Sequence, residues 1–100
     1  MDTMIRQGDV LLRSIENLLQ GATVRDEPGI KIAGERTGHA HRLMGIVFVA
    51  GARTLIRVSG LQPMTQEEHA DVTPPAGLFE VVQQREYVPA ARPRSRRFVD

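Results

Sequence analysis

The chain contains no cysteine, which excludes a disulfide framework and a thiolate zinc site. Any bound metal would therefore need histidine, carboxylate or water ligands. Aromatic residues make up only 4% of the chain, so the core must be built from Val, Leu, Ile and Met, which bury less area per side chain than aromatic residues do. No apolar run approaches the length of about 18 residues that a membrane span needs. The first residues lack the pattern of a secretory signal, so we expect a cytoplasmic protein.

Serine is also scarce. Outside the last ten residues the only serines are Ser14 and Ser59, and neither sits in the strand-turn-helix motif of a nucleophilic serine. The sequence therefore identifies no catalytic residue and leaves open whether the protein is an enzyme.

Length and charge indicate one domain with a distinct end. A chain of 100 residues suits a single core. We expect one β-rich domain over residues 1–90 and a basic tail over residues 91–100. The net charge is +1, but the tail holds Arg92, Arg94, Arg96 and Arg97, which could neutralise nucleic-acid phosphates. A nucleic-acid or protein partner bound through this tail is therefore one alternative function, although stacking aromatics are few.

Dense glycine and proline punctuation predicts short strands joined by turns. Segments rich in branched apolar residues are the strand candidates, namely residues 10–15, 30–32, 43–50, 55–58 and 77–88. The fold class that we predict is all-β, a small antiparallel barrel or sandwich of about six short strands.

One short helix remains an alternative at two places. Residues 14–20 place apolar side chains at helical spacing after Ser14. Thr65 and Glu68 match a capping box, and a helix that begins there must end before Pro74. The same stretch could instead be an extended edge segment.

Histidine is the most informative residue type in this chain. His39 and His41 are two residues apart, so an extended backbone would put both imidazoles on one face. His69 could return beside them as a third ligand, with Glu68 ligating and Asp71 in support. Such a site would suit a divalent transition metal such as zinc, iron or nickel. The alternative is that these are surface or structural histidines.

Arginine near this motif favours a different ligand. If Arg36, Arg42 and Arg85 lie near the histidines, the site is electropositive and would bind a small anionic ligand such as phosphate or a carboxylate. A third reading is a self-associating structural protein, a homo-oligomer in which the histidines belong to turns.

Two family resemblances follow from these motifs. The stretch Gly34 to His41 resembles the first motif of the cupins, metal-binding β-barrels, and that resemblance implies His39, His41 and His69 as ligands. The family's glutamate has no counterpart in residues 42–46. The blocks QGDVLL, GHAHR, EH and QREY look like those of a family of small uncharacterised bacterial and phage proteins, which implies that the blocks form one unit and transfers no function.

Overall fold

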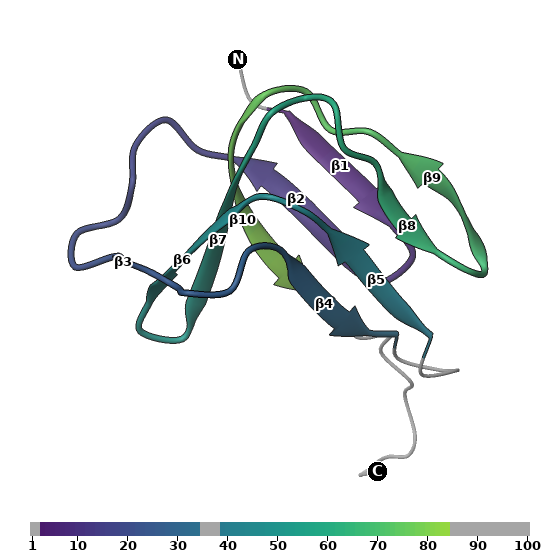
Figure 1. Cartoon of the computed structure of the whole chain (residues 1–100), viewed down its shortest axis with the longest axis horizontal. Helices are drawn as coiled ribbons and strands as arrows, with labels where there is room; N and C mark the ends of the chain where they lie inside the picture. Colours follow the sequence, from purple (N-terminus) through teal and green to yellow (C-terminus); the bar gives the residue numbers. More distant parts are fainter. Residues whose placement is uncertain (1–2, 35–38, 85–100) are drawn as a thin grey trace, which may run out of the picture.

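The computed structural model of the chain describes residues 3–34 and 39–84. Within these ranges the protein is all-β and consists of two antiparallel sheets (Figure 1). Sheet A has the strand order β1-β2-β10-β7-β6-β3. Its strands are β1 (Met4–Gln7), β2 (Val10–Ser14), β3 (Thr23–Val24), β6 (Ile46–Ala50), β7 (Arg53–Val58) and β10 (Gly77–Gln83). Sheet B has the order β4-β5-β8-β9 and comprises β4 (Ile30–Ala33), β5 (Ala40–Leu43), β8 (Met64–Gln66) and β9 (His69–Val72).

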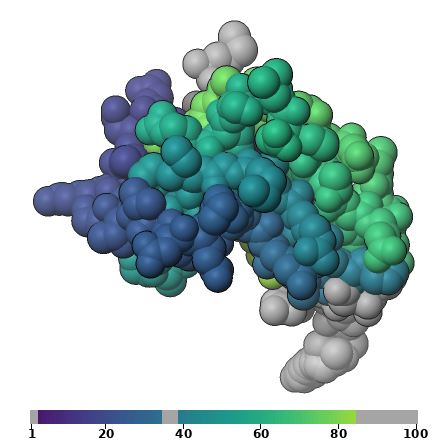
Figure 2. All heavy atoms as spheres, in the orientation of Figure 1, coloured from purple at the N-terminus to yellow at the C-terminus, as the bar shows by residue number. Residues whose placement is uncertain are grey.

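The two sheets are open at their edges, so the arrangement is sandwich-like and not a closed barrel. The sandwich alternative of the predicted fold class is therefore the correct one. The described residues form ten strands where about six were expected, mainly because short edge strands such as β1, β3 and β9 carry little apolar alternation. In the space-filling view the segment between β2 and β4 lies at one end and the green β8–β9 hairpin at the other (Figure 2).

The principal core fills the space between the sheets. It contains buried side chains from both sheets, namely Val10, Leu12, Ile30, Leu43, Val47, Ile56, Val58, Met64 and Phe79. Their neighbours Phe48, Leu55 and Leu78 point to the opposite face of sheet A, where Ile15, Leu19 and Ala22 pack over them. Sheet A is thus covered on both faces at this point, which explains why β6 is a continuous apolar run and why the adjacent residues Leu55 and Ile56 of β7 are both buried.

Neither helix alternative is correct for the described residues. Of residues 14–20, Ser14 ends β2 and residues 15–20 contain no helix, and the 65–68 stretch belongs to the β8–β9 hairpin. The reason is visible at the turn, where the Glu68 N–H donates to the side-chain oxygen of Gln66 (2.8 Å). That contact takes the backbone donor that Thr65 would have to accept from in a capping box.

Sheet A also holds a buried carboxylate with two arginine partners. Glu80 on β10 accepts hydrogen bonds from Arg53 Nε (2.8 Å) and Arg53 Nη2 (2.7 Å) and from Arg13 Nη2 (2.5 Å). The hydrogen bonds from Arg53 outweigh the effect of burial and, with those from Arg13, lower the pKa of Glu80 from 4.5 to about 2. The ionised carboxylate therefore ties β10 to its two neighbours β2 and β7.

Glu80→Gln tests this contribution through acid unfolding. Because the pKa of Glu80 is lower in the folded protein, its stabilising effect is complete above the unfolded pKa and disappears as the pH falls towards the folded pKa. We expect the variant to lose about 2 kcal/mol at pH 7, less than full conversion of the shift because both arginines are half exposed. Its free energy of unfolding should also fall less between about pH 4.5 and 2 than that of the wild type.

Urea unfolding at several pH values measures both effects. Glu16→Gln, which removes an exposed negative charge, is the matched control and should keep the wild-type slope. Parallel pH profiles for the Glu80 variant and the wild type would contradict the assignment.

Candidate functional site

The site begins at the tight hairpin between β1 and β2. Gln7 pairs with Val10, so Gly8 and Asp9 form a two-residue loop. Gly8 has a φ of 58°, in the left-handed region that favours glycine. This short loop turns the Asp9 carboxylate back over the end of the two sheets.

Asp9 is held from three sides. Its Oδ2 accepts a hydrogen bond from Gln83 Nε2 (2.7 Å), its Oδ1 lies 2.9 Å from His41 Nε2, and its backbone carbonyl accepts from the Gln84 N–H (2.7 Å). Burial raises the pKa of Asp9, but the hydrogen bonds from Gln83 and His41 outweigh it and leave that pKa below its ordinary value. Asp9 is therefore an ionised acceptor at neutral pH.

His41 lies on β5 and is completely buried, with 0% exposure. Its Nδ1 is 2.9 Å from Oε1 of Gln7, and its Nε2 faces Asp9. The Gln7 amide nitrogen donates to the carbonyls of Met64 (2.8 Å) and Ala70 (2.9 Å), which identifies Oε1 as the acceptor. Both ring nitrogens of His41 thus lie within hydrogen-bond distance of a side-chain oxygen.

These side chains connect the two sheets. We call Gln7, Asp9, His41 and Gln83 the His41 network. Gln7 and Gln83 come from β1 and β10 of sheet A, and the groups that they bind belong to β5, β8, β9 and the end of β4 in sheet B. The network is therefore a polar connection across one end of the sandwich.

His69 completes the arrangement from the solvent side. Its ring is stacked on that of His41 with a centroid separation of 6.2 Å and an interplanar angle of 13°. A Cβ atom at Gly8 would lie 2.6 Å from His69 Nε2 and 3.3 Å from His41 Cε1. Glycine is thus favoured there by its backbone conformation, and a larger residue would also displace the ring of His69.

The structure separates the two histidines of the HxH motif. His39 precedes β5, and its side chain is 45% exposed, with Nε2 3.5 Å from Glu67 and Nδ1 3.7 Å from Glu68. Glu68, predicted as a ligand beside His69, thus lies against His39. Asp71 is exposed on β9. Of the three predicted rings, His41 and His69 meet and His39 has separate partners.

No group of three or more His, Asp or Glu side chains that could hold a metal ion occurs in residues 3–34 and 39–84. His41 could become a ligand only by giving up one of its present hydrogen bonds. Metal binding through His39, His41, His69 and Glu68 stays a prediction from the sequence.

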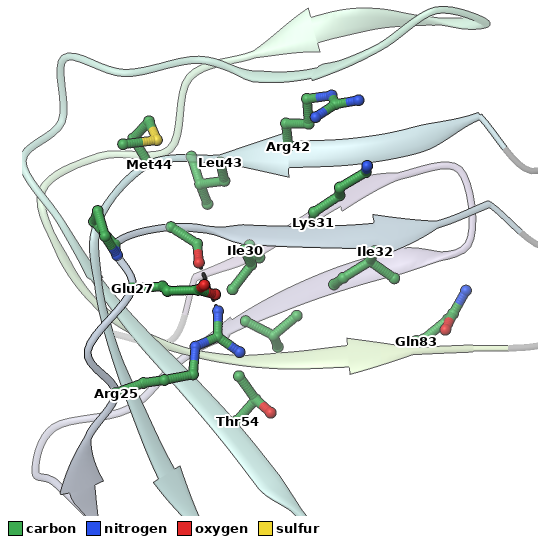
Figure 3. A pocket seen from close by; sticks show the side chains of 13 residues that line it. Arg25, Glu27, Ile30, Lys31, Ile32, Arg42, Leu43, Met44, Thr54 and Gln83 are labelled. Atoms are coloured by element: carbon green, nitrogen blue, oxygen red, sulfur yellow. Dashed lines mark hydrogen bonds between the residues drawn. The ribbon is translucent and has the colours of Figure 1, made fainter.

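A second candidate site lies beside β4. A hollow of about 590 Å³ opens there between the edge of sheet B and strands β7 and β10 (Figure 3). Its apolar part includes Ile30, Ile32, Leu43, Met44 and Val81, and its charged part consists of Arg25, Glu27, Lys31 and Arg42. This is where the structure puts Arg42, one of the arginines predicted to bind an anion. Arg36, Arg85 and the tail arginines lie outside the described residues.

Asp9, Gln7 and Gln83 were missed as members of the site. One signal for Gln7 was present, because it follows Ile5 by two residues and so occupies an inward-facing position of a strand. A polar side chain at such a position indicates a buried hydrogen-bond network. Asp9 and Gln83 carry no comparable signal, since their roles depend on how the loop and β10 meet in space.

Substitution of His41 and of His39 tests whether His41 is the histidine that stabilises the fold. His41→Leu removes the partner of Gln7 Oε1 and of the Asp9 carboxylate, so we expect a loss of about 3 kcal/mol in the free energy of unfolding. His39→Ala, at an exposed position, should cost less than about 0.5 kcal/mol. Urea unfolding at pH 7 measures both, and equal small effects would contradict the structural role of His41.

The structure contains no helix in its described ranges that could cross a bilayer. No curated protein and no solved structure matches the chain. A match is found with a protein family over residues 6–84. It agrees with the expected membership of an uncharacterised family, and a similarity to the cupins is not shown. Because this match covers most of the chain, the protein belongs to the family DUF8820, described as a domain of unknown function.

Proposed function

We propose that this domain is a small binding module that takes an anionic ligand with an apolar part into the hollow beside β4. The hollow combines what such a ligand requires, an apolar floor with a few polar groups at its margin. The sequence predicted a small anionic ligand beside the histidines; the proposal places that ligand beside Lys31, Arg42 and Arg25.

The observation that carries the proposal is the pairing of Lys31 with Arg42. The two residues are directly opposite on β4 and β5 and are both exposed. Directly opposite side chains share one face of a sheet, and like charges in that position are destabilising. An anionic group bound between them would relieve this repulsion and form charge-assisted hydrogen bonds.

Arg25 supports the same interpretation. Its Nη2 donates to the carbonyl of Gly29 (2.7 Å), which holds the guanidinium at the margin of the hollow (Figure 3). Glu27 is the only acidic residue among the described residues that line the hollow. The charge of the lining is therefore positive, which suits an anion.

Lys31→Gln and Arg42→Gln test the proposal because each should raise the stability of the free protein and lower its affinity for an anionic ligand. Each variant removes the like-charge pair, so we expect the free energy of unfolding to rise by about 0.3 kcal/mol. Each should also weaken binding of octanoate by about tenfold, since one charge-assisted contact is lost. Urea unfolding and a ¹H–¹⁵N NMR titration with octanoate supply the two measurements.

Arg57→Gln is the matched control. Arg57 is exposed on β7 of sheet A, opposite Ile46 and Leu78, and outside the lining of the hollow. Its substitution removes the same charge and should leave octanoate binding unchanged. An absence of shifts at the amides of β4 and β5 with millimolar octanoate would refute the proposal.

A further inference from the structure

The edge of β4 presents backbone groups to the hollow. Hydrogen-bonded and non-hydrogen-bonded pairs alternate along an antiparallel ladder. The Gly34 N–H donates to the His39 carbonyl (2.9 Å), and Ile32 with His41 is the pair two residues further along the same register. The backbone groups of Ile32 therefore point towards β5, and those of Lys31 and Ala33 point away from it, towards the hollow.

Side chains already bind two carbonyls of this edge. The Ala33 carbonyl accepts from Gln83 Nε2 (2.8 Å), which confirms that it points away from β5, and the Gly29 carbonyl accepts from Arg25. Both donors bind where a neighbouring strand would place its own N–H groups. Between them lie the N–H and carbonyl of Lys31. In the described ranges β4 has a paired strand on one side only, β5.

We propose that the ligand of the hollow is an extended peptide segment of another protein, which adds to the edge of β4 and carries an acidic side chain opposite Lys31. This inference rests on the proposed anion-binding function and specifies its ligand. The central peptide residue exchanges both backbone hydrogen bonds with Lys31, as in other cases of strand addition. Gln83 and Arg25 limit the pairing to a short stretch.

The register fixes the chemical pattern of the segment. A residue opposite Lys31 shares its face of sheet B, so a glutamate there lies next to Lys31, and Arg42 lies on the same face one strand further away. The residues on either side of this glutamate point to the other face, where Ile30 and Ile32 pack against the core and Val81 lines the hollow. These flanking residues are therefore apolar, and the pattern is apolar, acidic, apolar.

Charge argues against two other occupants of this edge. A second copy that paired through its own β4 would bring two lysines to the same edge, beside two arginines at position 42. The tail of this chain is rich in arginine over residues 92–97 and would add positive charge to a positive lining. An acidic segment is the complementary partner.

A capped pentapeptide, acetyl-Ser-Val-Glu-Val-Ser-amide, is the probe for the full-length protein. Its partner probes are the same peptide with an N-methylated glutamate and the same peptide with lysine in place of glutamate. We expect the first peptide to shift the amide signals of β4 and to slow hydrogen exchange at the Lys31 amide. N-methylation and the lysine replacement should each weaken binding at least tenfold, and Arg57→Gln should leave it unchanged.

The outcomes separate this inference from the proposed function. If octanoate binds while N-methylation has no effect, or while the exchange rate at Lys31 is unaltered, the peptide inference is wrong and anion binding survives. If neither octanoate nor the peptide binds, both fail. Protection of the Lys31 amide from exchange in the absence of peptide also overturns the inference. If the mass in solution then rises with protein concentration, a second copy occupies the edge of β4; if it does not, the chain itself occupies it.

Discussion

The buried hydrogen bonds of His41 are the interaction on which the arrangement of the two sheets depends. Apolar contacts between sheets tolerate small shifts, because their energy depends on area and not on direction. Hydrogen bonds with donor-acceptor distances of 2.9 Å to Gln7 and Asp9 do not tolerate such shifts. The network therefore selects one relative position of the sheets among those that the apolar core would permit.

This constraint also explains why the two candidate sites differ in character. At the end of the sandwich with the Gly8-Asp9 loop, polar groups bind one another, and His41 is buried. Beside β4 the opposite holds, since two positive side chains face each other and backbone groups of the edge strand meet a hollow. Unbalanced charge at an exposed surface is the better indication of a ligand than a satisfied buried cluster.

The sequence predicts the strands of the core well and the short edge strands poorly. Apolar runs bounded by glycine mark β2, β6, β7 and β10, because burial on one or both faces determines their composition. The β8–β9 hairpin lacks that signal, and Thr65 with Glu68 favoured a helix there. The stretch forms a turn because the Gln66 side chain accepts a hydrogen bond from the Glu68 N–H, a contact that residue spacing does not reveal.

The candidate site was predictable in part. The expected meeting of the three histidine rings holds for His41 and His69, because the chain returns in β9. It failed for His39, because strand β5 begins one residue later and the ring turns to the glutamates of the β8–β9 turn. The pairing of Lys31 with Arg42 depends on register, which a hairpin of unspecified turn length does not determine.

The sequence separations within the His41 network bear on how the chain folds. Gln7 contacts groups that are 34, 57 and 63 positions away, and Asp9 contacts Gln83 at a separation of 74. Such long-range contacts form only after both ends of the chain have been brought together. The β6–β7 hairpin has no such requirement and can form first. We infer that the network closes after the transition state, so it slows unfolding and leaves the folding rate largely unaltered.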